Sequence, residues 1–442
     1  MYPDSRTQFA RIRGTLQQKP VLLLFLALFF LLAMWFYADR VWGPPIPIHF
    51  SDLYPRWYGA HELLLHHRDP YSPAVTREIQ TWLHGAQNSY PGKNGEEDSF
   101  AYPAYLTFVL APTVGFSFPM VQDIFRIVLP LAVAATVLFW ISALGWNLTP
   151  VMRGALVLLT LGSFPVMECL YLQQPALLAS LFLAGSAAAL SRHRLTIAGA
   201  LLALATIKPQ FTVLFVPWLL LWAACDLSRL MPFLRSFFLT MAVLVGGSQL
   251  LAPGWIIKFL HGLHSYQNYT GNQSILSLWF GHFGAIITST ALVAPLAVVC
   301  WKSRSASVES ARFVFTSCLV LTTTLIIIPT MYPTGQILLL PAVFSLLQNG
   351  PAVFSSRWQK LSRFGALSII SWPWIAAVAC VLLAPVVPME ELRAHWLIPV
   401  GTFLVNPATM LLALATRIPS VLKGEAPSVL VSTEQSLAAV SK

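Results

Sequence analysis

Asp52 is the acidic residue best placed to do chemistry, because it stands at the start of an amphipathic stretch that begins at Leu53. A carboxylate held in a partly dry pocket at the edge of an apolar layer can take the proton of a hydroxyl group as a general base. The same position also suits a helix N-cap, since aspartate accepts hydrogen bonds from the first backbone N–H groups of a helix. Both roles are open, and one residue can fill both.

Lys208 is the cation best placed to bind an anion, because it interrupts apolar sequence between Ile207 and Pro209. An ammonium group among apolar residues is costly, and an anionic partner, most simply a phosphate group, would explain it. The alternative is a lysine at a helix end whose ammonium group reaches out to the membrane surface.

Glu168 and the pair Gln173-Gln174 interrupt another apolar stretch in the same way. These side chains could line a sugar pocket, or they could form a tight turn between two helices.

No metal site is expected on His61, His66 and His67, because separations of five and six residues do not place side chains on one helix face. The chain has no Walker loop, dinucleotide-binding glycine pattern, G-x-S-x-G or H-E-x-x-H motif. Its five cysteines show no C-x-x-C spacing. We therefore expect neither a metal nor a cofactor.

Composition identifies the environment of these residues. The 442 residues are 56% hydrophobic and only 10% charged, which leaves too little polar surface for a water-soluble domain. The net charge of +10 comes from short basic clusters between apolar runs, a pattern typical of cytoplasmic loops and not of a nucleic-acid-binding surface. We therefore predict an all-α polytopic membrane protein that does not bind nucleic acid.

Uncharged windows mark the expected membrane spans, and the longer windows must hold more than one crossing. The prediction is about twelve transmembrane helices. It requires that the proline-bounded run 103–118 does not cross the membrane, and that 196–223 goes out and back through Lys208. The windows are 21–38, 127–152, 169–191, 209–225, 236–257, 259–301, 313–356, 364–389 and 394–416.

The basic clusters can all be cytoplasmic at once, which sets the orientation. We expect a cytoplasmic tail over 1–19, a transmembrane domain over 20–416 and a second cytoplasmic tail over 417–442. The stretch 39–102 is then a long first external loop. Its apolar spacing predicts an amphipathic interfacial helix from Leu53 and a second over 73–84.

Several short motifs, taken in order, resemble glycosyltransferase family 87 of the membrane-embedded GT-C superfamily. The resemblance covers residues 20 to about 345. It rests on Asp52-Leu-Tyr-Pro-Arg-Trp-Tyr-Gly-Ala, Leu63-Leu-Leu-His-His-Arg-Asp-Pro-Tyr71, Phe100-Ala-Tyr-Pro103, Leu172-Gln-Gln-Pro-Ala-Leu-Leu178, Ala198-Gly199, Ile207-Lys-Pro209 and Gly271-Asn-Gln-Ser274.

The resemblance implies a GT-C fold and an inverting transfer of a sugar, mannose in particular, from a polyprenyl-phosphate donor. The family's general base carries over onto Asp52. The family often has a tryptophan and one or two histidines in the stretch that reads Thr330-Met-Tyr332-Pro-Thr-Gly-Gln336 here. Tyr332 keeps an aromatic residue but no histidine is present, which leaves the donor sugar open.

A lipid-linked donor would need residues that bind its phosphate and residues that bind its sugar. The phosphate of a lipid-linked donor lies at headgroup level, so a cation is needed there, and aromatic rings are needed to stack on sugars. We expect Lys208 and Arg56 to bind the donor phosphate. The expected sugar or acceptor ligands are Tyr54, Trp57, Tyr58, Tyr71, Tyr102, Gln173, Gln174, Asn272 and Tyr332.

The expected partners are a polyprenyl-phosphate-linked sugar, a lipid or glycan acceptor and membrane lipids. The expected location is a bacterial inner membrane with the active site on the external side. The main alternative is a transporter or lipid flippase that uses Lys208 and Glu168 as its substrate or proton site. A second alternative is a GT-C enzyme that moves a different sugar.

Overall fold

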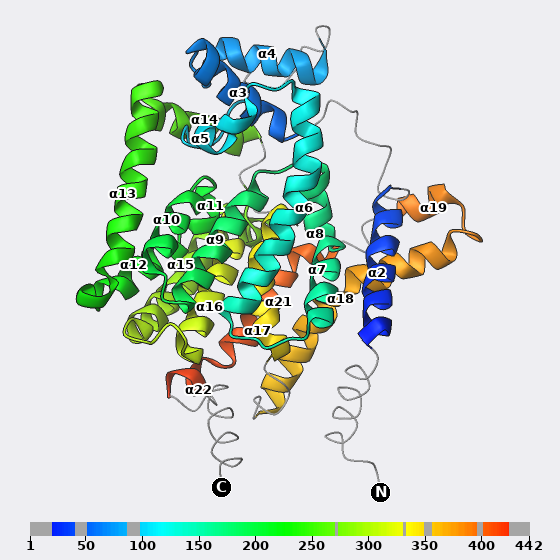
Figure 1. The fold of residues 1–442 in the computed structure, drawn as a ribbon. Coiled ribbons are helices and arrows are strands. Elements are labelled where there is room, and N and C mark those ends of the chain that lie inside the picture. Colours follow the sequence, from blue (N-terminus) through cyan, green and yellow to red (C-terminus); the bar gives the residue numbers. More distant parts are fainter. Residues whose placement is uncertain are drawn as a thin grey trace, which may run out of the picture.

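The computed structural model describes residues 20–39, 51–85, 98–269, 273–329, 333–348, 356–395 and 401–423. Within these ranges every regular element is a helix and none is a strand (Figure 1). In chain order the helices are α2 (Pro20–Tyr37), α3 (Leu53–His66), α4 (Pro73–His84), α5 (Leu106–Leu110), η2 (Ala111–Thr113), α6 (Phe118–Ala143), α7 (Pro150–Leu161), α8 (Phe164–Tyr171), α9 (Ala176–Ser191), α10 (Leu195–Ala205), α11 (Pro209–Thr212), α12 (Phe215–Ala224), α13 (Leu227–Leu251), α14 (Trp255–Tyr269), α15 (Ile275–Ser303), α16 (Ala311–Ile327), η3 (Pro333–Leu339), α17 (Leu340–Gln348), α18 (Arg357–Leu383), α19 (Met389–Ala394), η5 (Gly401–Leu404), α21 (Asn406–Ala415) and α22 (Ile418–Leu422).

The described helices confirm an all-α polytopic membrane protein. Four of them, α6, α13, α15 and α18, are long and apolar enough to cross a membrane, and the pair α7 and α8, bent by 64°, is a fifth candidate. Seven shorter apolar helices of 10–17 residues accompany them. The expected number of about twelve crossings stays a prediction.

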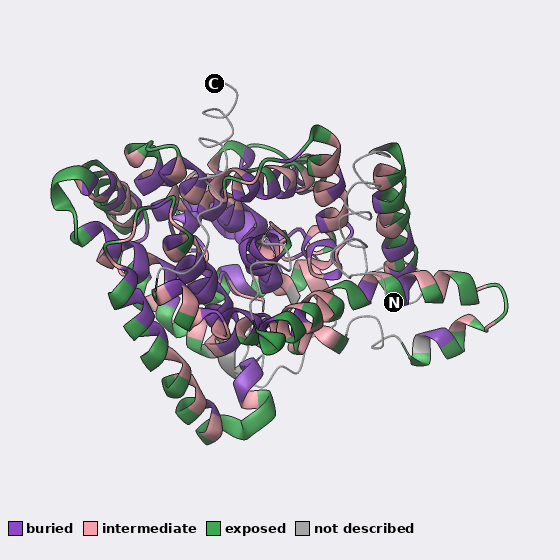
Figure 2. Cartoon of the chain, turned by 90° about the horizontal axis from the view of Figure 1, so that it is seen from below, coloured by how far each residue is buried: buried purple, intermediate pink, exposed green. Residues whose placement is uncertain are grey.

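The core and the outer surface divide as expected for a bundle in lipid. Buried residues gather in the central helices, of which α9 and α16 are buried along most of their length (Figure 2). Large apolar side chains are exposed on the outer helices, for example Leu250 of α13, which is 85% exposed. An apolar surface of this kind is suited to contact with lipid.

Two features of the predicted span map have counterparts in the backbone. The run 103–118 forms the short helices α5 and η2 before α6 begins at Phe118, and Pro103 and Pro112 bound or interrupt these short helices. The stretch 196–223 forms α10, α11 and α12, and its two ends meet. His193 lies before α10 and Arg229 lies after α12, with Arg229 Nη2 and His193 Nδ1 3.5 Å apart. The chain therefore reverses direction between α10 and α12, with Lys208 at the turn. The position of this turn relative to the membrane stays a prediction.

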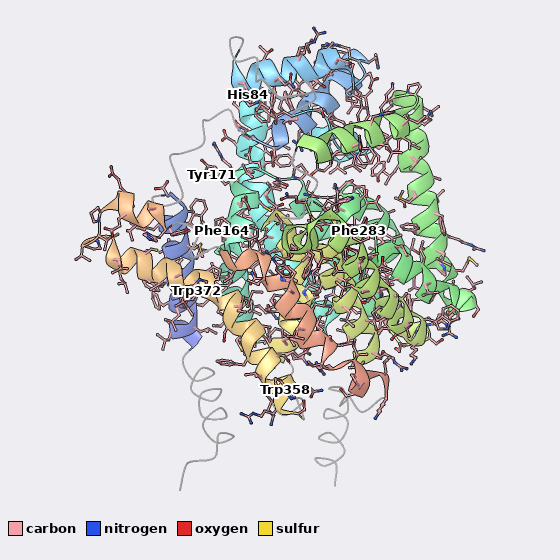
Figure 3. The ribbon with its side chains drawn as sticks, turned by 180° about the vertical axis from the view of Figure 1, so that it is seen from behind. His84, Phe164, Tyr171, Phe283, Trp358 and Trp372 are labelled. Atoms are coloured by element: carbon pink, nitrogen blue, oxygen red, sulfur yellow. The ribbon has the colours of Figure 1, made fainter. Side chains whose placement is uncertain are left out.

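The basic loops lie together at the end of the bundle opposite α3 and α4. His193, Arg229 and Arg304 line one polar pocket there, and Arg312 donates a hydrogen bond to Leu422 O over 2.6 Å. Figure 3 shows the two ends through His84 of α4 and Trp358 of α18. One-sided clustering of this kind is what the predicted orientation requires.

Three helices, α3, α4 and α14, form a layer over the other end of the bundle (Figure 1). The helix predicted over 73–84 has those bounds, and α3 begins at Leu53 as predicted. Most residues of α3 are buried, and α3 packs against α4, α5 and η2. Its predicted position at the membrane interface stays a prediction. Lys258 Nζ of α14 lies 2.6 Å from Asp69 Oδ2 and ties α14 to this layer.

Candidate functional site

A small polar pocket of about 60 Å³ lies where the external layer meets the bundle. Four separate parts of the chain contribute to it: the external layer with the segment that follows it, the turn between α8 and α9, the break between α10 and α11, and η3. Its charged and polar lining includes Asp52, Arg56, Tyr102, Gln174, Lys208 and Thr334. The pocket thus brings together the acid and the cation that the sequence singles out.

Asp52 faces the pocket and does not cap α3. Its backbone N–H donates to Leu172 O over 2.9 Å, which fixes the start of α3 against the α8–α9 turn. The Asp52 carboxylate accepts no hydrogen bond from the first turn of α3, where Ser51 Oγ accepts from Leu53 N instead. The N-cap interpretation of Asp52 is therefore wrong, and its side chain is available for chemistry.

Gln173 and Gln174 diverge because Gln173 adopts a left-handed backbone with φ of 53°. The Gln173 amide points into the structure, where its Oε1 accepts from Ser51 Oγ and its Nε2 donates to Gln122 O. Gln174 points into the pocket, and its Nε2 donates to Asp52 Oδ2. One residue of the pair builds the turn and the other reaches the site.

Lys208 occupies the non-helical position before Pro209, where α10 ends and α11 begins. Its Nζ donates to Gln174 Oε1 over 3.4 Å and lies 5.1 Å from the centroid of the Phe211 ring. The ammonium group therefore faces a polar pocket and not the lipid surface. A single amide, that of Gln174, bridges Lys208 and Asp52.

Arg56 lies one helical turn after Asp52, so both side chains share a face of α3. The residue is buried, and its guanidinium carbon lies 5.0 Å from the centroid of the Tyr102 ring. Two cations thus flank one carboxylate at the same end of the bundle.

Burial raises the pKa of the Asp52 carboxyl above its ordinary value. The charges of Arg56 and Lys208 and the hydrogen bond from Gln174 oppose this shift, whereas the nearby Asp98 adds to it. A carboxylate with a raised pKa is a stronger base than one in water, provided that it is ionised, and the two cations favour the ionised form.

Four predicted aromatic ligands do not line the pocket, because each is engaged within the external layer. The Tyr54 ring stacks on Trp82 with centroids 3.7 Å apart. Trp57 Nε1 donates to Thr113 O, and the hydroxyls of Tyr58 and Tyr71 donate to Glu78 and Tyr102 O. Tyr102 does line the pocket.

Only one of the remaining predicted ligands is found in the pocket. Gln174 lines the pocket, Gln173 does not, and Asn272 and Tyr332 lie outside the described residues. Sequence reasoning missed Gln210, Leu263 and Thr334, which complete the lining. Gln210 follows Lys208 closely and could have been included, but nothing in the sequence marks Leu263 or Thr334.

A larger apolar cavity of about 410 Å³ lies beside the polar pocket, between α2, α7, α8, α17 and α18. The short helix η3 borders both spaces: Thr334 lines the polar pocket, and Gln336 and Ile337 line the apolar cavity. Leu340, Ile370 and Trp374 belong to the apolar side. A ligand with a charged head and a long apolar chain would match the two spaces.

Of three comparisons with known proteins, one finds a match. No curated protein and no solved structure matches the chain. The family model described as glycosyltransferase family 87 matches residues 100–329, which is more than half of the chain. The matched range contains Tyr102, Gln174 and Lys208 and begins after Asp52 and Arg56. With its polytopic helical fold, the chain belongs to glycosyltransferase family 87 and is a membrane glycosyltransferase.

Proposed function

We propose that the protein transfers a sugar from a polyprenyl-phosphate donor to a hydroxyl group of a lipid or glycan acceptor, with Asp52 as the general base. The observation that carries the proposal is the shared pocket of Asp52 and Lys208, whose side chains one amide bridges. Family membership supports the enzyme and not the transporter or flippase alternative.

The chemistry needs a base and a cation on opposite sides of the anomeric carbon. Asp52 takes the proton of the acceptor hydroxyl while its oxygen forms a bond to the anomeric carbon of the sugar. The bond between that carbon and the phosphate oxygen breaks, and polyprenyl phosphate leaves with the electron pair. Because attack comes from the face opposite the leaving group, the configuration inverts.

The leaving phosphate gains negative charge, which Lys208 and Arg56 are placed to stabilise. Both line the pocket, and Arg56 is buried, where an electrostatic interaction is stronger than in water. The reaction as proposed needs no metal at this pocket, since two cationic side chains are available for the phosphate.

Gln174 acts as a positioning residue in this scheme. Its Nε2 donates to Asp52 and its Oε1 accepts from Lys208, so the orientation of the amide is fixed from both sides. The hydrogen bond to Asp52 holds one carboxylate oxygen and leaves the other for the acceptor hydroxyl.

The apolar cavity supports a donor that carries a long hydrocarbon chain. A phosphate at Lys208 would lie next to η3, on whose other side the cavity begins. The cavity lies among membrane helices, where an isoprenoid chain from the bilayer could enter without crossing water. Mannose is proposed as the sugar from the family resemblance, and the external side of a bacterial inner membrane as the location.

Purified protein in lipid nanodiscs tests the proposal directly. It would be incubated with radiolabelled polyprenyl-phosphate-mannose and with the corresponding glucose and arabinose donors, together with bacterial lipid extract as acceptor. We expect a new mannosylated lipid or glycan with the wild type and none with Asp52→Asn. Transfer from none of the donors, or equal transfer by Asp52→Asn, would contradict the proposal.

A further inference from the structure

A second cluster of chemically capable side chains lies at the far end of α3, away from the polar pocket. His61 Nδ1 lies 3.1 Å from Glu62 Oε1, and His66 Nε2 lies 4.0 Å from the same oxygen. One ligand atom from each residue falls within 4.8 Å of the other two. The sequence spacing predicts no such cluster. It forms because Glu62 lies between the histidines, and His66 is the last residue of α3.

The charges around this cluster centre on the buried carboxylate of Glu62. Arg68 donates to Glu62 Oε2 and to Glu78 Oε1, each over 2.6 Å, so two carboxylates share one guanidinium group. The hydroxyl of Tyr58 also donates to Glu78, but it brings no charge. Glu62 is 4% exposed, and a buried carboxylate needs favourable partners at both oxygens. A cation beside Glu62 Oε1 would be one.

Arg68 also orients the carboxylate of Glu62. Because Oε2 accepts from Arg68, the other oxygen, Oε1, is turned towards His61 and His66. Partners that fix a ligating carboxylate in this way are usual around metal ions. The exposed fraction of the His66 side chain is 54%, so an ion from solution can reach the cluster.

We propose that His61, Glu62 and His66 bind a divalent transition-metal ion, for which Zn²⁺ is the best match. Two imidazole nitrogens and one carboxylate oxygen form a donor set that Zn²⁺ accepts, with water at the fourth position. Ligand atoms around a tetrahedral Zn²⁺ lie roughly 3.4 Å apart. The separations from Glu62 Oε1 of 3.1 and 4.0 Å bracket that value.

The proposed ion would act on structure and not on sugar transfer. It would hold the last turn of α3 and, through Glu62 and Arg68, the start of the connection to α4. The site is independent of the proposed function, since Asp52 precedes α3 and Arg56 lies in its first turn, whereas the cluster lies in its last turns.

The test uses the full chain in detergent, first stripped of metal with a chelator and then dialysed. We expect calorimetry to show one Zn²⁺ bound per chain, and Tm to rise by a few degrees at saturating Zn²⁺. Added Co²⁺ should give the visible absorption of a site with nitrogen and oxygen ligands. His61→Gln and His66→Gln should each weaken Zn²⁺ binding at least about tenfold, since each removes one of three ligands.

His261→Gln is the matched control, because His261 is an exposed histidine on α14 outside the cluster. It should bind Zn²⁺ like the wild type. Circular dichroism of each variant without metal should match that of the wild type, which separates lost binding from lost folding. The absence of stoichiometric Zn²⁺ binding by the wild type, or unchanged binding by the His61→Gln/His66→Gln double variant, would overturn the proposal. Neither result depends on glycosyltransferase activity.

Discussion

The two cavities beside η3 differ in size, lining and origin. The polar pocket has about 60 Å³ and is lined by charged and amide side chains from turns and helix ends. The apolar cavity has about 410 Å³ and is lined mainly by aliphatic and aromatic side chains from the middle of membrane helices. Turns bring polar groups together without breaking helices inside the bilayer, and helices supply apolar surface without exposing backbone groups.

The difference indicates a division of labour for a lipid-linked substrate. We infer that the polar pocket holds the groups that change charge during transfer and that the apolar cavity holds the part of the donor that does not react. Changes in the pocket should then act mainly on kcat, and changes in the cavity mainly on the KM for the donor.

The largest expected effect is that of Asp52→Asn. The amide cannot accept the acceptor's proton, so kcat should fall by about 1,000-fold, within the range known for general-base catalysis. Binding of donor measured with labelled lipid should stay close to that of the wild type. Asp123→Asn is the control, since Asp123 pairs with Arg126 on an exposed surface. A small effect on kcat at Asp52 would remove the assigned base.

Lys208→Gln should be the next most damaging change. Removing the cation that faces the leaving phosphate should lower kcat by about 100-fold. Gln210→Ala alters the same pocket lining without removing a charge and should lower kcat much less. Equal losses in the two variants would show that Lys208 contributes shape and not charge.

Filling the apolar cavity should raise the KM for the donor. Ile370→Trp adds bulk inside the cavity, and the KM for a long-chain donor should rise about tenfold while kcat changes little. Ile127→Trp places the same side chain on the lipid-facing surface of α6, where Ile127 is 66% exposed, and should have no effect. If the cavity holds the hydrocarbon chain, the KM for a short-chain donor should not change in Ile370→Trp.

The pH dependence should report Asp52. Because burial raises its pKa, the rate should rise with pH through a value above that of an ordinary aspartate and then level off. Gln174→Met removes a hydrogen bond that favours the ionised form, so this acidic limb should move to higher pH. A merely structural role of Gln174 would lower the rate at every pH without moving the limb.

The same pKa shift has a consequence for stability. A raised pKa in the folded state means that the ionised carboxyl destabilises the fold above that pKa, and that this cost disappears as the pH falls through it. Asp52→Asn should therefore have a Tm equal to or above that of the wild type at neutral pH, with the difference shrinking in acid. Thermal unfolding at several pH values measures it.

The smallest expected effect is that of a change in the packing of α10, the helix that precedes Lys208. A methyl group added at Gly199 of α10 would lie 2.8 Å from Phe237 N of α13, so the two helices would have to separate. Gly199→Ala should lower Tm by a few degrees and shift both kcat and KM modestly. Gly246→Ala on α13 meets no atom within 4 Å and is the control.

Local patterns were sufficient for much of the fold. Apolar windows predicted the helical membrane domain, and the bounds 73–84 were predicted correctly because Ser72-Pro73 starts a helix and Gly85 ends it. Proline positions predicted a break in 103–118, where the structure has only the short helices α5 and η2 before α6. Asp52 was selected as the acid at the start of an amphipathic stretch, and Lys208 and Gln174 as polar interruptions of apolar sequence. The structure places all three in one pocket.

Long-range packing accounts for what the sequence did not give. Tyr54 was expected at the sugar, but Trp82, 28 residues later in the chain, stacks on its ring. The apolar cavity is lined by residues of α2, α7, α8, η3, α17, α18 and α21, and no local pattern in the sequence marks it. The cluster of His61, Glu62 and His66 depends on where α3 ends and on how Arg68 turns Glu62.

The sequence by itself determined that the protein lies in a membrane, that it is helical, and which few polar residues near apolar sequence are candidates for function. Each of these follows from composition or from spacing within a few residues. Only the tertiary structure decided that the Asp52 carboxylate leaves its own helix start to Ser51 and meets Lys208 through Gln174. The physical reason is that a side chain with several possible partners takes those that folding brings closest, and here they lie 122 and 156 residues away in the chain.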